Sequence, residues 1–184
     1  MKVYPTFQTP HLFLRPFMCS DAQEVARLAG EKEVVDMLFD FDPSEPGVAH
    51  QWITDQLECF QTGEWVNFAI VELPRHVLVG SIGLVRDSLF KDKAEIAYWL
   101  GKQYWGRGYA TEAGQVVLRY GFDVLEYSVI YGRHFVHNPA SGRVLEKLGM
   151  QVGDPMPVYL WKNDDWKKLA MRLMHRRDYN TVYL

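Results

Sequence analysis

The chain switches between two hydrophobic patterns, one typical of strands and one typical of helices. We expect strands where apolar residues alternate or run together with β-branched side chains, at 11–17, 65–73, 76–85, 94–100, 129–136, shortly after 149, and at 169–174. We expect helices where apolar residues recur at helical spacing, at 20–30, 48–62, 109–124 and 138–148. Hairpins come first and a strand–helix–strand–helix run follows, so the pattern predicts a layered α/β (α+β) protein with a mixed sheet.

Composition and charge exclude several classes of protein. The 184 residues suit a single domain over 1–184, and 48% hydrophobic residues is ordinary for a globular chain. A net charge of −3 makes a nucleic-acid partner unfavourable. Cys19 and Cys59 are too few for a disulfide framework or a zinc site, so we expect a cytoplasmic protein without a metal. No apolar run approaches the roughly 20 residues of a membrane span, and the start lacks the pattern of a signal peptide.

The segment "QYWGRGYATEAG" (103–114) carries the most informative motif, because it joins an expected strand to an expected helix. Backbone N–H groups converge at such a turn, where the helix dipole is positive. Gly106 and Gly108 allow unusual backbone angles and let an anion approach closely. Lys102 and Arg107 add positive charge. The turn therefore favours a phosphate or a pyrophosphate, although a tight turn that only starts the helix is the simpler alternative.

Two common nucleotide motifs do not account for this turn. The phosphate-binding loop G-x-x-x-x-G-K-[ST] is absent. The dinucleotide pattern G-x-G-x-x-G would require glycine where the chain has Thr111, and no acidic residue closes a following strand. The anion is therefore expected to belong to another kind of ligand.

A second segment, "HNPASGRVLEKLGM" (137–150), begins with the signals of a helix start. Asn138 can cap the helix, Pro139 suits its first position, and Ser141 lies in its first turn. Taken alone, Asn138 is as well explained by capping as by any functional role.

Together with "TPHLFLRPF" near the start, "AEIAYWLGKQYWGRGYATEA" and "HNPASGRVLEKLGM" resemble the GNAT superfamily of acetyl-CoA-dependent N-acetyltransferases. The resemblance covers nearly the whole chain and is to the branch that acetylates the N-termini of ribosomal proteins. It implies one GNAT domain with a mixed, mostly antiparallel sheet of six to seven strands, splayed at strand 94–100 and flanked by about four helices.

The resemblance also implies how acetyl-CoA, the co-substrate, is held. The glycine turn would bind its pyrophosphate, and backbone groups of the splayed strand would pair with the pantetheine arm. Arg143 and Lys147 would reach the 3′-phosphate, although a solvated helix face explains each of them equally well. The implied cofactor-binding residues are Tyr98, Trp99, Leu100, Gln103, Gly106, Arg107, Gly108, Tyr109, Ala110, Thr111, Asn138, Ser141, Arg143 and Lys147.

Two residues are candidates for catalysis. Ser141 matches a serine near the cofactor sulfur, where we expect it to orient and stabilise the leaving thiolate. Glu95 is a candidate base for the acceptor ammonium, or else an ordinary carboxylate at a strand end. The tyrosine acid of many superfamily members is missing, because Leu145 stands in its position. Deprotonation at pH 7 costs about 4.6 kcal/mol for a lysine amine but about 1.4 kcal/mol for an α-amine, which favours an N-terminal acceptor.

The expected reaction is direct transfer of acetyl from acetyl-CoA to a primary amine in a ternary complex. A small amine acceptor, such as an aminoglycoside, polyamine or amino acid, is one alternative, and a non-catalytic CoA-binding regulator is another. Acids in 31–45 could attract a cationic acceptor. The basic stretch 162–177 could contact RNA or be an ordinary surface hairpin, and the sequence does not decide between a monomer and a homodimer. His134 is a weaker site candidate. The acids are Glu31, Glu33, Asp36, Asp40, Asp42 and Glu45.

Overall fold

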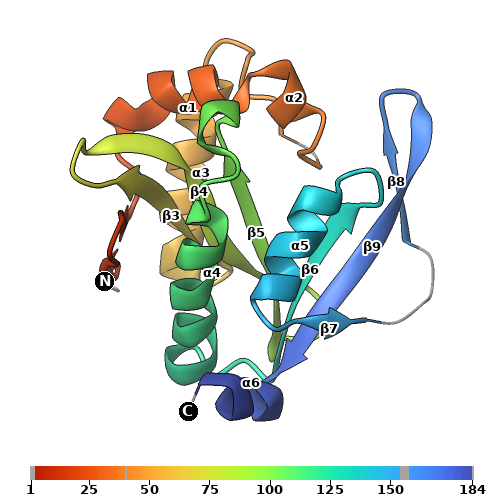
Figure 1. Ribbon diagram of the computed structural model, residues 1–184. Helices are drawn as coiled ribbons and strands as arrows, with labels where there is room; N and C mark the ends of the chain where they lie inside the picture. The colour runs from red at the N-terminus through yellow and green to blue at the C-terminus, as the bar shows by residue number, and fades with distance from the viewer. Residues whose placement is uncertain (1–2, 40, 154–157, 184) are drawn as a thin grey trace.

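The computed structural model describes residues 3–39, 41–153 and 158–183, in which nine strands form one twisted sheet with helices on both faces (Figure 1). The strands are β1 (Phe7–Gln8), β2 (Leu12–Arg15), β3 (Trp65–Glu72), β4 (Val77–Arg86), β5 (Lys93–Leu100), β6 (Val129–Phe135), β7 (Gln151–Val152), β8 (Val158–Lys162) and β9 (Asp165–His175). The helices are α1 (Ala22–Ala29), α2 (Lys32–Val35), α3 (Val48–Thr62), α4 (Tyr109–Arg119), α5 (Pro139–Lys147) and α6 (Arg176–Tyr183). Within these residues, no helix combines the length and the apolar character that crossing a membrane requires.

The order of strands across the sheet is β1-β2-β3-β4-β5-β6-β9-β7, and β8 pairs with β9 outside this path. Neighbouring strands are antiparallel except β5 and β6, which are parallel. The prediction of a mixed, mostly antiparallel sheet is therefore confirmed. The sheet has more strands than the six to seven expected because β1 and β7 are only two residues long and β8 lies at the margin of the sheet.

The single parallel pair is also where the sheet opens. β5 and β6 pair only from Lys93 to Glu95, opposite Val129 to Tyr131. Beyond Glu95, β5 stays paired with β4 as far as Leu100, while β6 stays paired with β9. The two strands therefore diverge as a V between α4 and α5 on one face and α3 on the other (Figure 1).

Close packing holds α5 against one arm of this V. An added Cβ at Gly132 of β6 would lie 2.7 Å from Cδ2 of Leu145, so only glycine lets the helix approach the strand this closely. Leu145 is fully buried there. The residue that replaces the family's tyrosine is therefore part of the core.

The structure corrects the expected elements near the C-terminus. The strand expected at 169–174 is longer, because β9 starts at Asp165 and the segment "WKNDDW" before it forms a tight hairpin with β8. Asn163 and Asp164 form its two-residue turn with φ of 53° and 56°, values that Asn and Asp tolerate better than most residues. The helix expected at 109–124 ends as α4 at Arg119 and continues as a π-helical turn to Val124.

Candidate functional site

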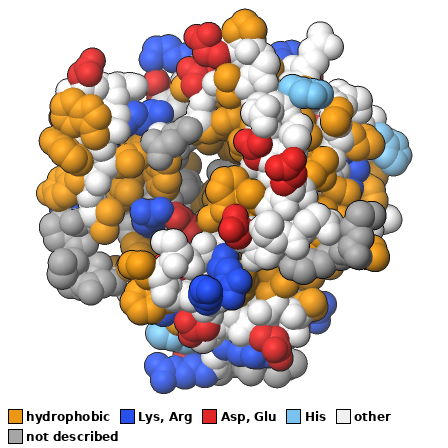
Figure 2. Space-filling model, turned by 180° about the vertical axis from the view of Figure 1, so that it is seen from behind, with side chains coloured by type: hydrophobic (Ala, Val, Ile, Leu, Met, Phe, Trp, Pro, Cys, Tyr) orange, Lys and Arg blue, Asp and Glu red, His pale blue; other side chains and the backbone are white. Residues whose placement is uncertain are grey.

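A cleft of about 700 Å³ lies where β5 and β6 part, and residues from both faces of the sheet line it. Side chains alternate along a strand, so neighbouring residues of β5 reach opposite faces. The Tyr98 hydroxyl contacts Ser141 of α5, whereas Glu95 and Trp99 face the side of α1 to α3. Figure 2 looks onto that second side, where hydrophobic side chains surround a hollow. The cleft therefore connects two chemically different walls.

The wall beside α4 is built from the glycine turn. After the short 3-10 helix at Lys102–Tyr104, Gly106 and Gly108 have φ of 76° and 85°, which favours glycine at both positions. An ideal Cβ at either residue would meet no atom within 4 Å. Both glycines line the cleft, so open space lies directly beside the backbone there.

The backbone amides of this turn lack internal acceptors. The amides of Thr111 and Glu112 both donate to the carbonyl of Gly108 at 3.0 Å. In contrast, the amides of residues 106–110 donate to no acceptor within the described part of the chain. These five consecutive N–H groups sit at the positive end of the α4 dipole, which is the arrangement that a diphosphate requires.

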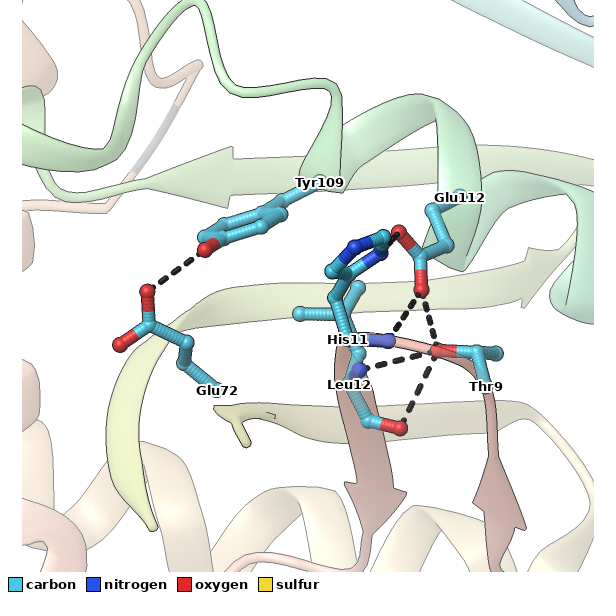
Figure 3. A network of polar contacts seen from close by, with 6 residues as sticks. All are labelled: Thr9, His11, Leu12, Glu72, Tyr109 and Glu112. Atoms are coloured by element: carbon cyan, nitrogen blue, oxygen red, sulfur yellow. Dashed lines mark hydrogen bonds and ion pairs between the residues drawn. The ribbon is translucent and has the colours of Figure 1, made fainter. Parts of the chain in front are cut away.

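Two buried or partly buried carboxylates fix this turn from outside (Figure 3). Glu72, at the end of β3, is 5% exposed and accepts a 2.5 Å hydrogen bond from the Tyr109 hydroxyl. It also lies 3.4 Å from the guanidinium of Arg107 and pairs with Arg75. The Tyr109 hydrogen bond and the two arginines hold the pKa of Glu72 below its usual value.

Glu112 of α4 is the second carboxylate that holds the start of this helix in place. Its carboxylate accepts hydrogen bonds from the Thr9 hydroxyl at 2.6 Å and the His11 amide at 2.9 Å, and it contacts the His11 ring at 2.9 Å (Figure 3). The first turn of α4 is therefore fastened to the start of β2 and to the end of β3. None of these partners was apparent from the sequence, because they are separated by 37 to 103 positions.

The wall beside α5 presents Ser141. Asn138 caps the helix through its Oδ1, which accepts from the Ser141 amide at 3.2 Å, and Pro139 occupies the first turn. The hydroxyls of Ser141 and Tyr98 are 2.9 Å apart, and the Tyr98 hydroxyl also donates to the Ser141 carbonyl at 2.9 Å. Burial raises the pKa of Tyr98 to about 12, so the phenol is neutral at physiological pH.

Glu95 lies on the opposite face and is held by Arg133 of β6. The guanidinium of Arg133 donates two parallel hydrogen bonds to the carboxylate, of 2.9 and 2.5 Å. The hydrogen bond to Glu95 raises the pKa of Arg133, and the Glu95 side chain is 13% exposed. Arg133 could not be predicted as the partner, since only the parallel register of β5 and β6 brings the two side chains together.

Most of the residues expected to bind the cofactor line this one cleft. Gln103 and Arg107 do not, since Gln103 is exposed in the 3-10 helix and Arg107 turns to Glu72. His134 lines the cleft, and its Nδ1 is 2.9 Å from the Phe135 carbonyl oxygen. No cluster of three metal-ligating side chains occurs among the described residues. The expected residues that line the cleft are Tyr98, Trp99, Leu100, Gly106, Gly108, Tyr109, Ala110, Thr111, Asn138, Ser141, Arg143 and Lys147.

The acidic stretch 31–45 contributes apolar side chains, but not its described carboxylates, to the cleft wall. Glu33 pairs with Lys102 at 2.5 Å, Asp36 pairs with Lys32 at 2.8 Å, and no described carboxylate of the stretch lines the cleft. Asp40 is outside the described residues. Part of the basic stretch 162–177 is also paired internally, as in the 2.8 Å contact of Lys167 with Asp165.

Comparison with known proteins adds three findings. A family model described as an acetyltransferase (GNAT) domain matches residues 11–151. The uncharacterized N-acetyltransferase YoaA of Bacillus subtilis is 27% identical over 163 residues, which cover 88% of this chain and 91% of YoaA. The ribosomal-protein-S5-alanine acetyltransferase of Vibrio fischeri superposes with a TM-score of 0.83 at 19% identity, covering 95% of this chain and 98% of the other.

The same fold also serves a different acceptor. The spermidine N-acetyltransferase of Vibrio cholerae, solved with CoA and spermine, superposes with a TM-score of 0.79 at 17% identity. The match covers 94% of this chain and 99% of the other. Similarity of fold therefore leaves the acceptor to be argued from the cleft itself.

Proposed function

Since this chain belongs to the GNAT acetyltransferase family, we propose that it acetylates the α-amine at the N-terminus of a peptide or protein. The chain has the GNAT fold and is an acetyl-CoA-dependent N-acetyltransferase, as the resemblance of its sequence segments implied. What we propose here is the identity of the acceptor. The observation that carries the proposal is the single cleft on which the free amides of the glycine turn, Ser141 and Glu95 all converge.

The residues on the α4 and α5 side bind and orient acetyl-CoA in this proposal. The free amides of 106–110 hold the diphosphate, and the exposed Arg143 and Lys147 supply positive charge on the same side of the cleft. Backbone groups of Tyr98 to Leu100 on the side where β6 departs hold the pantetheine arm, apart from the Leu100 carbonyl, which accepts from the Trp105 indole at 2.8 Å. One of their N–H groups can stabilise the negative charge that develops on the thioester oxygen.

Ser141 stabilises the leaving sulfur, and Tyr98 positions Ser141. The Tyr98 hydroxyl donates to the Ser141 carbonyl and contacts its hydroxyl, which fixes the serine at the mouth between the two strands. A thiolate with a pKa of about 8.5 needs little protonation at neutral pH. Orientation and hydrogen bonding are therefore sufficient, and the buried core residue Leu145 needs no tyrosine in its place.

Glu95 receives the proton of the attacking ammonium, directly or through a water molecule. Both oxygens of the Glu95 carboxylate accept a hydrogen bond from Arg133. A site whose one lining carboxylate is already paired with an arginine suits an α-amine, whose deprotonation at pH 7 costs about 1.4 kcal/mol, better than a lysine amine at about 4.6 kcal/mol. The Glu95–Arg133 pair therefore favours an N-terminal acceptor.

A peptide with one free α-amine and one lysine tests this proposal. Release of the CoA thiol is followed over time, and mass spectrometry locates the acetyl group. The proposal requires acetylation at the α-amine, and a matched peptide with a blocked N-terminus must not react. Turnover of the lysine instead, of small amines alone, or of no amine despite tight acetyl-CoA binding would contradict it.

A further inference from the structure

The wall of the cleft on the side of α1 to α3 is made mainly of aromatic rings. Phe39, Phe41, Trp52 and Trp65 all line it, and Met37 adds a flexible apolar side chain. They come from the segment after α2, from α3 and from the start of β3. We call these five side chains the apolar wall.

Three of the four rings of the apolar wall, those of Phe39, Phe41 and Trp52, are in contact with other rings. Phe41 stacks on Trp52 with centroids 4.9 Å apart and an angle of 26°, and Trp52 meets Phe17 edge-on at 5.0 Å. Phe39 meets Phe135 edge-on at 5.2 Å, and the Arg133 guanidinium lies 5.5 Å from its centroid. A ligand would therefore meet a prearranged surface, which lowers the entropy cost of binding.

The apolar wall offers almost no charge to a cationic acceptor. Glu95 is the one carboxylate among the described residues that line the cleft, and Arg133 binds both of its oxygens. The remaining charged side chains of the lining, Arg143 and Lys147, are positive. An acceptor with several ammonium groups, such as a polyamine or an aminoglycoside, would find no counter-charge for the groups that do not react.

Two neutral donors lie in the same part of the cleft. Gln56 is 1% exposed, and its Nε2 has no hydrogen-bond partner among the described residues, although its Oε1 accepts from Asn67 at 2.9 Å. The indole N–H of Trp99, a residue 8% exposed, also lacks a partner among the described residues. Both side chains line the cleft. Both nitrogens have almost no accessible surface, so an acceptor atom does not reach them in this conformation.

From the apolar wall and its lack of counter-charge, we propose that the preferred acceptor is a peptide N-terminus whose first residue has a large apolar side chain. This inference rests on the proposed N-terminal acetylation and specifies its substrate. The first side chain packs against the apolar wall. The α-amine then lies toward Glu95, at the junction of the two walls.

The test compares hexapeptides that differ only in the first residue, which is Phe, Leu, Ser or Asp, together with spermidine. We expect kcat/KM for the Phe and Leu peptides to exceed that for the Ser peptide by about tenfold or more, because burial of a large apolar side chain is worth that factor. We expect the Asp peptide and spermidine to be poorer than the Ser peptide. Equal or better turnover of the Ser or Asp peptide or of spermidine would overturn the inference.

The panel separates this inference from the proposed function. Efficient α-acetylation of the Ser peptide without a preference for Phe or Leu would leave N-terminal acetylation in place and overturn only the inference. Acetylation of no peptide would overturn both.

Two variants locate the preference in the cleft. Phe41→Ala removes a ring of the apolar wall, so the ratio of kcat/KM for the Phe peptide to that for the Ser peptide should fall toward one. Phe90→Ala is the matched control, because Phe90 is 53% exposed and lies outside the lining. An unchanged ratio in Phe41→Ala, or an equal fall in Phe90→Ala, would contradict the assignment to this wall.

Discussion

The two walls of the cleft are built in opposite ways. On the α4 and α5 side, the decisive groups are backbone amides of five consecutive residues, 106–110, and open space lies beside Gly106 and Gly108. On the α1 to α3 side, the decisive groups are side chains from the segment after α2 and from α3, β3, β5 and β6 that tertiary packing brings together. A ligand common to a whole family suits the first kind of wall, because main-chain groups tolerate sequence change. A ligand particular to one protein suits the second kind, where each substitution alters the surface.

The largest expected effect comes from Gly108→Asp, which attacks the backbone-built wall. Gly108 has φ of 85° and open space beside it, so an aspartate there would place a carboxylate against the proposed diphosphate site. We expect acetyl-CoA affinity to fall at least about 100-fold in calorimetry, because the carboxylate repels the diphosphate and the new side chain keeps it away from the backbone. The fold should survive.

Gly47→Asp is the matched control for that variant. Gly47 also precedes a helix, has φ of 84° and has open space for a Cβ, but it does not line the cleft. Both variants therefore carry the same backbone strain. Similar losses of acetyl-CoA affinity in the two proteins would show that strain, and not the glycine turn, explains the result.

Glu95→Gln has the next largest effect and tests the charged pair of the second wall. We expect kcat/KM for a peptide acceptor to fall about 100-fold at pH 7, because the proton acceptor is lost. The defect should shrink as pH rises through the α-amine pKa of about 8, since the neutral amine no longer needs a base. Glu33→Gln, at an exposed carboxylate outside the lining, is the control. A defect that is independent of pH would assign Glu95 a structural role only.

Tyr98→Phe changes the junction between the walls, and its effect on activity should be smaller than that of Glu95→Gln. It removes the hydroxyl that contacts Ser141 and keeps the ring, so we expect kcat to fall about tenfold while the affinity for acetyl-CoA changes little. Because the pKa of Tyr98 is about 12, the loss should be constant between pH 6 and pH 10. The control is Tyr131→Phe, which removes a hydroxyl that is bound to Asp87 and lies outside the cleft. An equal fall in kcat for both variants would contradict the positioning role.

Glu72→Gln should have the smallest effect, and it acts through stability. The carboxylate of Glu72 is the charged partner of Tyr109 and of two arginines. Its loss should lower Tm by about 3–6 °C at pH 7 and weaken acetyl-CoA binding a few-fold. The pKa of Glu72 is lowered in the folded state, so its stabilisation is present above the unfolded value of about 4.3. The Tm difference should therefore disappear as pH falls through the lower folded value. A difference that persists in acid would assign the effect to packing.

The same contrast explains what the sequence could predict. Gly106, Gly108 and the capping residue Asn138 are needed by local backbone geometry, so they mark the α4 and α5 wall in a single sequence. The helix at 48–62 and the strands of the early hairpins were predictable because their apolar periodicity is strong. The family's fold and cofactor followed from these local blocks.

The other wall left no comparable signal. Arg133 meets Glu95 only because of the parallel register between β5 and β6, and Glu72 reaches Tyr109 only in the folded sheet. The aromatic rings of the apolar wall look like ordinary core residues in the sequence, since a half-buried ring has the same periodicity as a buried one. Long-range packing therefore determines the acceptor site, and it could be described only from the structure.

A crystal structure of the protein with acetyl-CoA would show directly whether the glycine turn binds the diphosphate. We expect oxygens of the diphosphate to lie within hydrogen-bonding distance of the backbone amides of residues 106–110, with the thioester between β5 and β6. A diphosphate bound elsewhere on the protein, with those amides facing only solvent, would contradict it.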